Sequence, residues 1–168
     1  PCGIRIHGGT SRRFDKKGFR IYFRSEYGGN DPNLQLFPQH DRDFFDRLIL
    51  YAPSTDQAAG TRYGTYIADI LTQTLFRDMG HPVCGWTPVS LYLNQEYWGM
   101  YWLRERLEDA FVEYHLGIDN MDLHHDSWYA GVAEVKEGEL DYWMETLSFF
   151  HSNNMSDPEK YLTAETQY

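Results

Sequence analysis

The fold is decided by the stretch Ile4-Arg5-Ile6-His7-Gly8-Gly9-Thr10-Ser11-Arg12-Arg13-Phe14-Asp15-Lys16-Lys17-Gly18-Phe19-Arg20-Ile21. Apolar and polar residues alternate on both sides of a turn that contains glycine, which predicts a hairpin of two half-buried strands. We expect the strands at residues 2–7 and 19–24. The first 24 residues carry seven Lys or Arg and one Asp, a local charge of +6, whereas the rest of the chain carries −16. Positive charge is therefore concentrated where the chain is rich in glycine.

This basic turn has the composition of an anion site. Backbone N–H groups freed by Gly8 and Gly9, the hydroxyl groups of Thr10 and Ser11, and the cationic side chains can together surround phosphate oxygens. A solvated basic hairpin is the other interpretation that the local pattern allows. Both interpretations stay open at this point.

Length and composition predict a single globular domain over residues 1–168. A chain with 42% hydrophobic and 17% aromatic residues can bury a sizeable core. No apolar run approaches the roughly 20 residues of a membrane helix, and no signal peptide is visible, so we expect no membrane span. The net charge of −10 opposes binding to nucleic acid but leaves small phosphorylated ligands open. Cys2 and Cys84 are expected to be free thiols.

The rest of the chain predicts a mixture of strands and helices. Apolar residues recur at helical spacing from Arg62 to Met79, and Gly80 and Pro82 supply a stop. A second hairpin is expected at residues 89–93 and 97–104, and further helices are expected at 105–116, at 140–150 and from Ser156 onward. Residues 27–39 are expected to be a loop, and residues 44–50 a buried segment of ambiguous type.

These elements predict an α+β fold. Each hairpin offers one apolar face, so we expect both hairpins in one mostly antiparallel sheet that packs with the helix from Arg62 to Met79. The turn of the second hairpin raises one difficulty. A two-residue turn at Asn94-Gln95 would place Gln95 at positive φ, at a cost on the order of 1 kcal/mol, so a longer turn is the alternative.

Other groups of chemically active side chains carry weaker signals. Asp119, Asp122, His124, His125 and Asp126 have the side chains of metal ligands, but adjacent histidines in an acidic segment are more often simply solvated. We therefore predict no metal site there.

Three motifs in order resemble the spore coat protein H (CotH) kinase family. They are the basic hairpin of residues 4–21, the helix from Arg62 to Met79-Gly80, and Leu91-Tyr92-Leu93-Asn94-Gln95-Glu96-Tyr97-Trp98-Gly99-Met100-Tyr101 with Arg104-Glu105-Arg106. The resemblance covers about residues 3–160. One departure is Gln95, where the family usually has Gly.

The resemblance implies an atypical, protein-kinase-like domain that transfers the γ-phosphoryl group of ATP to Ser or Thr of a protein, with Mg²⁺ or Mn²⁺. In the family, the catalytic base and the metal ligands lie in later segments resembling Asn-x-Asp-Trp and Asp-x-Asp. We therefore expect these residues after Tyr168, so that this chain is a partial domain that lacks the C-terminal part and is inactive alone. A Ser/Thr-rich protein substrate and a location in the spore coat or at an extracytoplasmic surface also follow from the resemblance.

The residues expected to bind ATP phosphates are Ser11, Arg12, Lys17, Glu105 and Arg62. Strand parity places Lys17 on the inward face with Phe19, and Glu105 on the face of Tyr101, so we expect these two side chains to pair as a kinase Lys and Glu do. The alternative for Glu105 is a position in the first turn of the following helix. The alternative for Arg62 is a structural salt bridge.

Two functions of different classes compete. The first is the kinase. The second is a non-catalytic coat or cell-surface module, either a pseudokinase or a carbohydrate-binding module that uses Tyr97, Trp98 and Trp102.

Overall fold

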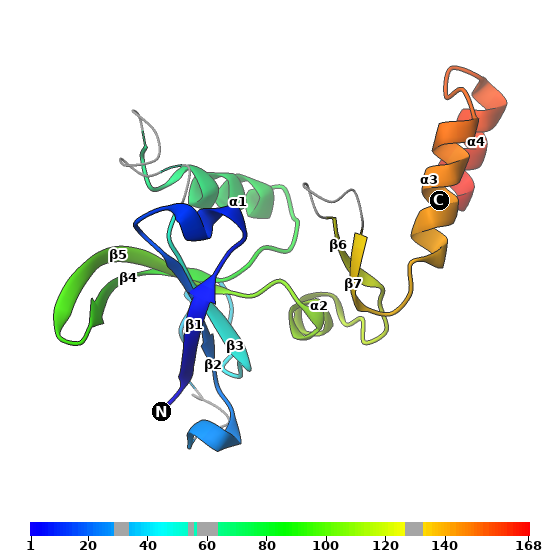
Figure 1. Ribbon diagram of the computed structural model, residues 1–168. Coiled ribbons are helices and arrows are strands. Elements are labelled where there is room, and N and C mark those ends of the chain that lie inside the picture. The colour runs from blue at the N-terminus through cyan, green and yellow to red at the C-terminus, as the bar shows by residue number, and fades with distance from the viewer. Residues whose placement is uncertain (29–33, 54–55, 57–63, 127–132) are drawn as a thin grey trace. The chain divides into compact units, whose positions relative to one another are not determined.

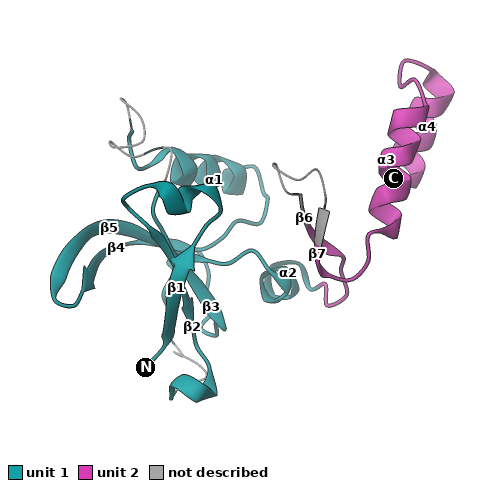
Figure 2. Ribbon diagram, in the orientation of Figure 1, with its two compact units in different colours: residues 1–117 teal, residues 118–168 magenta. Residues whose placement is uncertain are grey.

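The computed structural model describes residues 1–28, 34–53, 56, 64–126 and 133–168. The chain forms two compact units, residues 1–117 and residues 118–168 (Figure 2). In the described part of the chain, no helix combines the length and the apolar character needed to cross a membrane.

The first unit is built on a five-stranded sheet (Figure 1). Its strands are β1 (Gly3–His7), β2 (Gly18–Tyr22), β3 (Arg47–Tyr51), β4 (Trp86–Leu93) and β5 (Glu96–Glu105). Their order is β1-β2-β3-β5-β4, and every neighbouring pair is antiparallel. The predicted α+β class and the single antiparallel sheet that contains both hairpins are therefore confirmed. The segment of ambiguous type supplies β3, which separates the two hairpins.

One face of the sheet carries the apolar core. Phe19 of β2 lies opposite Leu50 of β3, and both pack with Tyr101 of β5, which is fully buried. Phe37 and Phe45 form a second cluster with Leu48, and both come from residues 34–46, which have no regular secondary structure. This segment therefore contributes to the core through its aromatic side chains, although part of it was expected to be only a connecting loop.

The apolar side chains of β1 do not follow the expectation of a half-buried strand. β1 lies at the edge of the sheet, and Ile4 and Ile6 are 52% and 46% exposed. Their strand partners are Ile21 and Phe19, as the alternation predicts. The register is thus as expected, but among the described residues nothing buries the outer edge of this face.

The first α-helix of the chain begins later than predicted. α1 spans Ala68–Asp78, and residues 64–67 are not helical. It is joined to the sheet by polar contacts, which include an ion pair of 2.6 Å between Asp69 and Arg104. Its apolar residues Leu71, Leu75 and Phe76 remain exposed. The expected close packing of this helix against the sheet is therefore wrong within the described residues.

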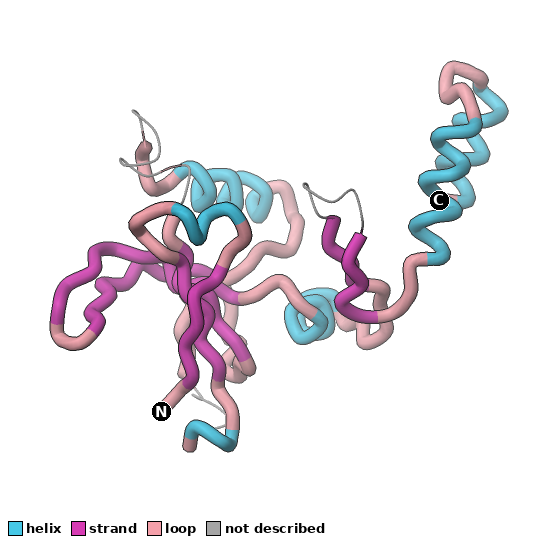
Figure 3. Tube along the Cα trace, in the orientation of Figure 1, coloured by secondary structure: helices cyan, strands magenta, loops and turns pink. Residues whose placement is uncertain are grey.

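The remaining helices follow the predicted order. α2 spans Asp109–Leu116 and ends at Gly117 in the left-handed conformation, whereas Glu105 belongs to β5. The second unit contains β6 (Leu123–Asp126), β7 (Ala133–Glu137), α3 (Asp141–Ser152) and α4 (Pro158–Gln167) (Figure 3). Asp157 caps α4 by accepting a hydrogen bond from the N–H of Glu159, which is the start signal expected from the sequence.

The turn between β4 and β5 has only two residues. Asn94 and Gln95 both have positive φ, 50° and 71°, and Leu93 pairs directly with Glu96. Asn tolerates the left-handed region, but Gln carries a Cβ penalty there.

We expect Gln95→Gly to stabilise the protein by about 1 kcal/mol, because glycine removes this penalty. Chemical denaturation monitored by circular dichroism measures the effect. Asn94→Gly is the matched control and should have a smaller effect, because Asn already tolerates positive φ. Equal effects of the two substitutions would contradict the explanation.

Candidate functional site

The loop between β1 and β2 has an ordered conformation. It contains a short 3₁₀ helix, Thr10–Arg13, and Gly8 just before it has a φ of 119°. A Cβ atom added at Gly8 would lie 2.0 Å from the hydroxyl oxygen of Ser11. The loop therefore requires glycine at this position for two reasons, the positive φ and the close approach of Ser11.

Lys17 holds the end of this loop together. Its ammonium group donates hydrogen bonds to the carbonyl oxygens of Arg12, at 2.9 Å, and of Phe14. β2 begins only at Gly18, so the alternation of the strand does not govern the direction of the Lys17 side chain. The expected pairing of Lys17 with Glu105 is wrong.

Lys16, which was expected to point outward, is the lysine that reaches toward the sheet. Its Nζ donates to the carbonyl oxygen of Met100 at 2.6 Å. The same atom lies 4.7 Å and 4.8 Å from the ring centroids of Tyr66 and Tyr101, so it makes cation–π contacts with both. Burial lowers the pKa of Lys16. Lys16 therefore fastens the loop to β5.

Glu105 has other partners. The residue is 3% exposed, and its Oε1 accepts a hydrogen bond from Arg42 at 2.9 Å. Its Oε2 lies 3.0 Å from Nε2 of His40, 3.1 Å from Nε2 of His115, and 2.7 Å from the N–H of Gly85, which donates to it. We call Glu105 and these four partners the Glu105 cluster.

The Glu105 cluster strongly favours the charged carboxylate. Burial alone would raise the pKa of Glu105, but the hydrogen bond from His40, the N–H of Gly85 and the two histidines lower it to about 2. No local sequence pattern indicates these partners, because His40, Arg42 and Gly85 lie far from Glu105 in the chain. The prediction that Glu105 extends the inward face of β5 is confirmed.

His40, Glu105 and His115 bring three potential metal ligands within 4.8 Å of one another. A metal at Nε2 of His40 would require the proton of that ring to sit on Nδ1. Nδ1 of His40, however, accepts a hydrogen bond from the backbone N–H of Arg42 at 3.2 Å. The tautomer that this bond selects carries its proton on Nε2 and donates it to Glu105. The arrangement is therefore a hydrogen-bonded anchor.

The other sequence-based candidates are Arg62 and the acidic segment. Arg62 lies outside the described residues. In the acidic segment of the second unit, Asp122 accepts a hydrogen bond from the N–H of Glu139, and His124 packs against Trp143. The prediction that this segment holds no metal stays a prediction.

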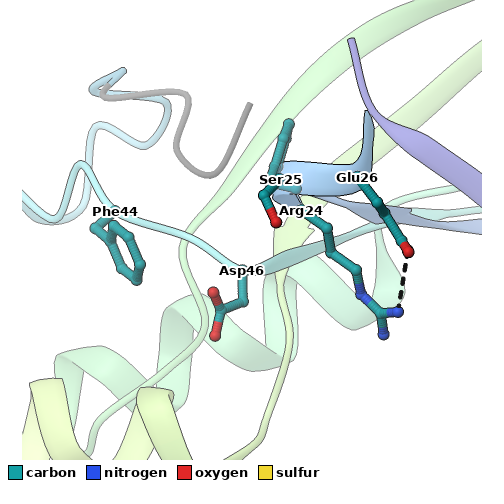
Figure 4. Close-up of a pocket in the computed structure, with 6 residues that line it drawn as sticks. Arg24, Ser25, Glu26, Phe44 and Asp46 are labelled. Atoms are coloured by element: carbon teal, nitrogen blue, oxygen red, sulfur yellow. Dashed lines mark hydrogen bonds and ion pairs between the residues drawn. The ribbon is translucent and has the colours of Figure 1, made fainter. Parts of the chain in front are cut away.

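A shallow pocket lies elsewhere on the first unit. Phe23, Arg24, Ser25, Glu26, Phe44 and Asp46 line it. Figure 4 shows the Arg24 guanidinium group paired with the Glu26 carboxylate, with the Asp46 carboxylate also lining the pocket. Two carboxylates and one paired cation do not favour phosphate.

Comparison with known proteins adds one finding. A family model described as "CotH kinase protein" matches residues 4–165, which is nearly the whole chain. A search of the curated proteins gives no match.

We expect Gly8→Ala to destabilise the protein by about 2 kcal/mol, because the new methyl group has an unfavourable φ and meets the Ser11 hydroxyl. Gly9→Ala is the matched control and should cost less, because a Cβ atom there meets open space. Thermal unfolding of both variants measures the difference. The explanation fails if Gly9→Ala is the more damaging change.

We expect Glu105→Gln to destabilise the protein at pH 7 by about 3 kcal/mol or more, because it leaves buried Arg42 without its charge partner. Glu113→Gln, on an exposed position of α2, is the matched control. The folded-state pKa of Glu105 is depressed, so its stabilisation is complete above about pH 4.5 and is lost as the pH falls toward about 2. Denaturation across this range should therefore show a steeper loss of stability for the native protein than for Glu105→Gln. Parallel curves would refute this assignment.

Proposed function

The chain belongs to the CotH kinase family, and on this basis we propose that it forms the nucleotide-binding part of an atypical protein Ser/Thr kinase. Such an enzyme transfers the γ-phosphoryl group of ATP to a hydroxyl group of a Ser/Thr-rich protein. The observation that carries the proposal is the ordered basic loop at the start of the matched region, residues 8–17. Phosphoryl transfer depends on such positive charge, since the protein contributes mainly positioning and electrostatic stabilisation.

The loop carries side chains that suit the phosphate chain of ATP. Arg12 is exposed at the end of the 3₁₀ helix, and the Ser11 hydroxyl lies one residue before it. An arginine offers several N–H donors in a planar fork, which matches phosphate oxygens. Lys17 supports the backbone of this part of the loop, because its ammonium group donates hydrogen bonds to the carbonyl oxygens of Arg12 and Phe14. Arg62 remains a further candidate for phosphate contact.

Glu105 takes a supporting role in this proposal. Its carboxylate is fully engaged with its partners in the Glu105 cluster, and these contacts position β5. Lys16 in turn fastens the loop to β5. Mg²⁺ or Mn²⁺ would bridge the phosphates of the nucleotide. Residues 8–17 contain one carboxylate side chain, that of Asp15. The loop by itself therefore offers far fewer metal ligands than either ion takes.

A second candidate function rests on the β4–β5 hairpin. Tyr92 and Tyr97 are each 61% exposed, and their ring centroids are 5.3 Å apart. Exposed aromatic rings of this kind can stack on sugar rings, which supports the non-catalytic alternative of a carbohydrate-binding module. Trp102, also expected on such a surface, is part-buried and donates its indole N–H to the carbonyl oxygen of Tyr66.

The test is the affinity for ATP of the purified chain, measured by calorimetry at one salt concentration with Mg²⁺ present. We expect Arg12→Gln to weaken ATP binding about tenfold, because it removes a charge-assisted hydrogen bond to phosphate. Arg13→Gln removes the same charge from the next residue and is the matched control.

The kinase proposal gains if Arg12→Gln weakens ATP binding much more than Arg13→Gln does. It fails if the chain binds no ATP. Binding to immobilised glycans that is lost with Tyr97→Ala and unaffected by Arg12→Gln would instead support the carbohydrate-binding alternative.

A further inference from the structure

The face of the sheet opposite the aromatic core collects arginine side chains. Arg5 of β1 lies directly opposite Arg20 of β2, and Arg47 of β3 lies opposite Tyr22. His7 stands on the same face of β1, two residues after Arg5. Arg106 follows the end of β5 and acts electrostatically on both His7 and Tyr22. We call Arg5, His7, Arg20, Arg47 and Arg106 the arginine face.

Arg20 lies at the centre of these contacts. Its Nη2 is 3.1 Å from Nδ1 of His7, and its Nη1 donates to the Tyr22 hydroxyl oxygen at 3.3 Å. Its Nε atom is buried and has no hydrogen-bond partner within the part of the chain that the structure describes. Because a guanidinium group only donates, Nδ1 of His7 must accept, which leaves the His7 proton on Nε2.

The positive charges of the arginine face are not balanced. Glu108 accepts a hydrogen bond from Arg106 at 2.6 Å and forms an ion pair with Arg47, with 3.2 Å between the two charged groups. It therefore occupies one side of the face. In the described ranges, neither Arg5 nor Arg20 forms an ion pair with a carboxylate. Like charges directly opposite one another on neighbouring strands are destabilising. The pair of Arg5 and Arg20 is thus an uncompensated electrostatic cost in the folded protein.

The titration of His7 reflects this surplus. Burial and the positive charges of Arg20 and Arg106 lower the pKa of His7 to about 4, and Arg12 and Arg5 act in the same direction. Burial would raise the pKa of Tyr22, but the hydrogen bond and the charge of Arg20 lower it. The pKa values of the basic His7 ring and of the acidic Tyr22 hydroxyl are therefore lowered by the same positive charges. A bound anion would offset these charges.

We propose that the arginine face is a binding site for an anion with several adjacent phosphoryl groups. Arg5 and Arg20 would contact the phosphate oxygens from neighbouring strands, and the Nε2–H of His7 supplies a further donor. Several cations spread along two strands match a chain of phosphates better than a single carboxylate. Arg12 of the loop also acts electrostatically on His7, so the loop and the arginine face share one positive field.

Two kinds of ligand carry several adjacent phosphoryl groups: a nucleotide, in its triphosphate chain, and an inorganic polyphosphate. The first rests on the proposed function and extends its phosphate contacts from the loop onto the sheet. The second is independent of it. The experiment therefore uses inorganic tripolyphosphate as the probe and ATP as the second arm.

The measurement is a titration of the whole chain with tripolyphosphate at constant ionic strength. Calorimetry gives the affinity, and the NMR signals of the His7 imidazole monitor the site. We expect the His7 signals to move and the pKa of His7 to rise by about one unit or more, since a bound anion favours the charged ring. Arg20→Gln and Arg5→Gln should each weaken tripolyphosphate binding about tenfold. Arg24→Gln is the matched control, because Arg24 follows β2 but is exposed and pairs with Glu26.

The outcomes separate the site from the proposed function. Loss of binding in Arg5→Gln with retention in Arg24→Gln supports the site, even if Arg20→Gln fails to fold, because Arg5 is exposed on an edge strand. Displacement of tripolyphosphate by ATP identifies the nucleotide as the source. Tripolyphosphate binding without ATP binding supports the site and contradicts the proposed function. Unmoved His7 signals, or equal weakening in Arg5→Gln and Arg24→Gln, would overturn the inference.

Discussion

The buried carboxylate of Glu105 is the constraint on which the first unit depends. A charged group taken out of water must be saturated with hydrogen bonds, or the fold loses several kcal/mol. Here the partners come from three separate regions: His40 and Arg42 from an irregular segment, Gly85 from the approach to β4, and His115 from α2. Since all of them converge on one side chain at the end of β5, the position of each region is tied to the sheet. The ion pair with Arg42 therefore organises segments that have little regular structure of their own.

The sheet of the first unit has two faces with different chemistry. The face of Phe19, Leu50 and Tyr101 is apolar and ends at the Glu105 cluster. The opposite face carries the arginines, whose charges are only partly compensated by Glu108. Alternation along each strand is enough to produce this separation, because successive side chains point to opposite faces. An electrostatically costly face persists in a fold when another part of the molecule supplies the stability, and the core face does so here.

The side chains of the loop between β1 and β2 have two different roles in the proposed function. Its two lysines are engaged with backbone carbonyl oxygens, one within the loop and one on β5, so they act first as supports. In the proposal, the side chains that meet the ligand are those of Ser11 and Arg12. This division suits a domain whose proposed task is to hold a polyphosphate rather than to supply a reacting group. Membership of the CotH kinase family gives the reason to expect that the polyphosphate belongs to ATP.

Local pattern was sufficient for much of the fold. Alternation and turn residues determined the two hairpins, the glycine-bearing loop between β1 and β2, and the Asp157 cap of α4, because each depends on neighbours within a few residues. The family could also be recognised from three motifs in order. The parity of β5 correctly directed Glu105 inward, since alternation holds as long as a strand continues.

Only the tertiary structure decided the partners of the charged groups. Lys17 precedes β2, so the strand rule did not apply to it, and its ammonium group turned to the nearest carbonyl oxygens. Glu105 found Arg42 and two histidines that no local pattern connects with it, because contacts between distant segments depend on how the chain folds back on itself. The burial of Phe37 and Phe45 in an irregular segment and the exposure of Ile4 at a sheet edge have the same cause. Sequence by itself determined which elements form and which way their side chains alternate, and the packing of distant elements determined which charges meet.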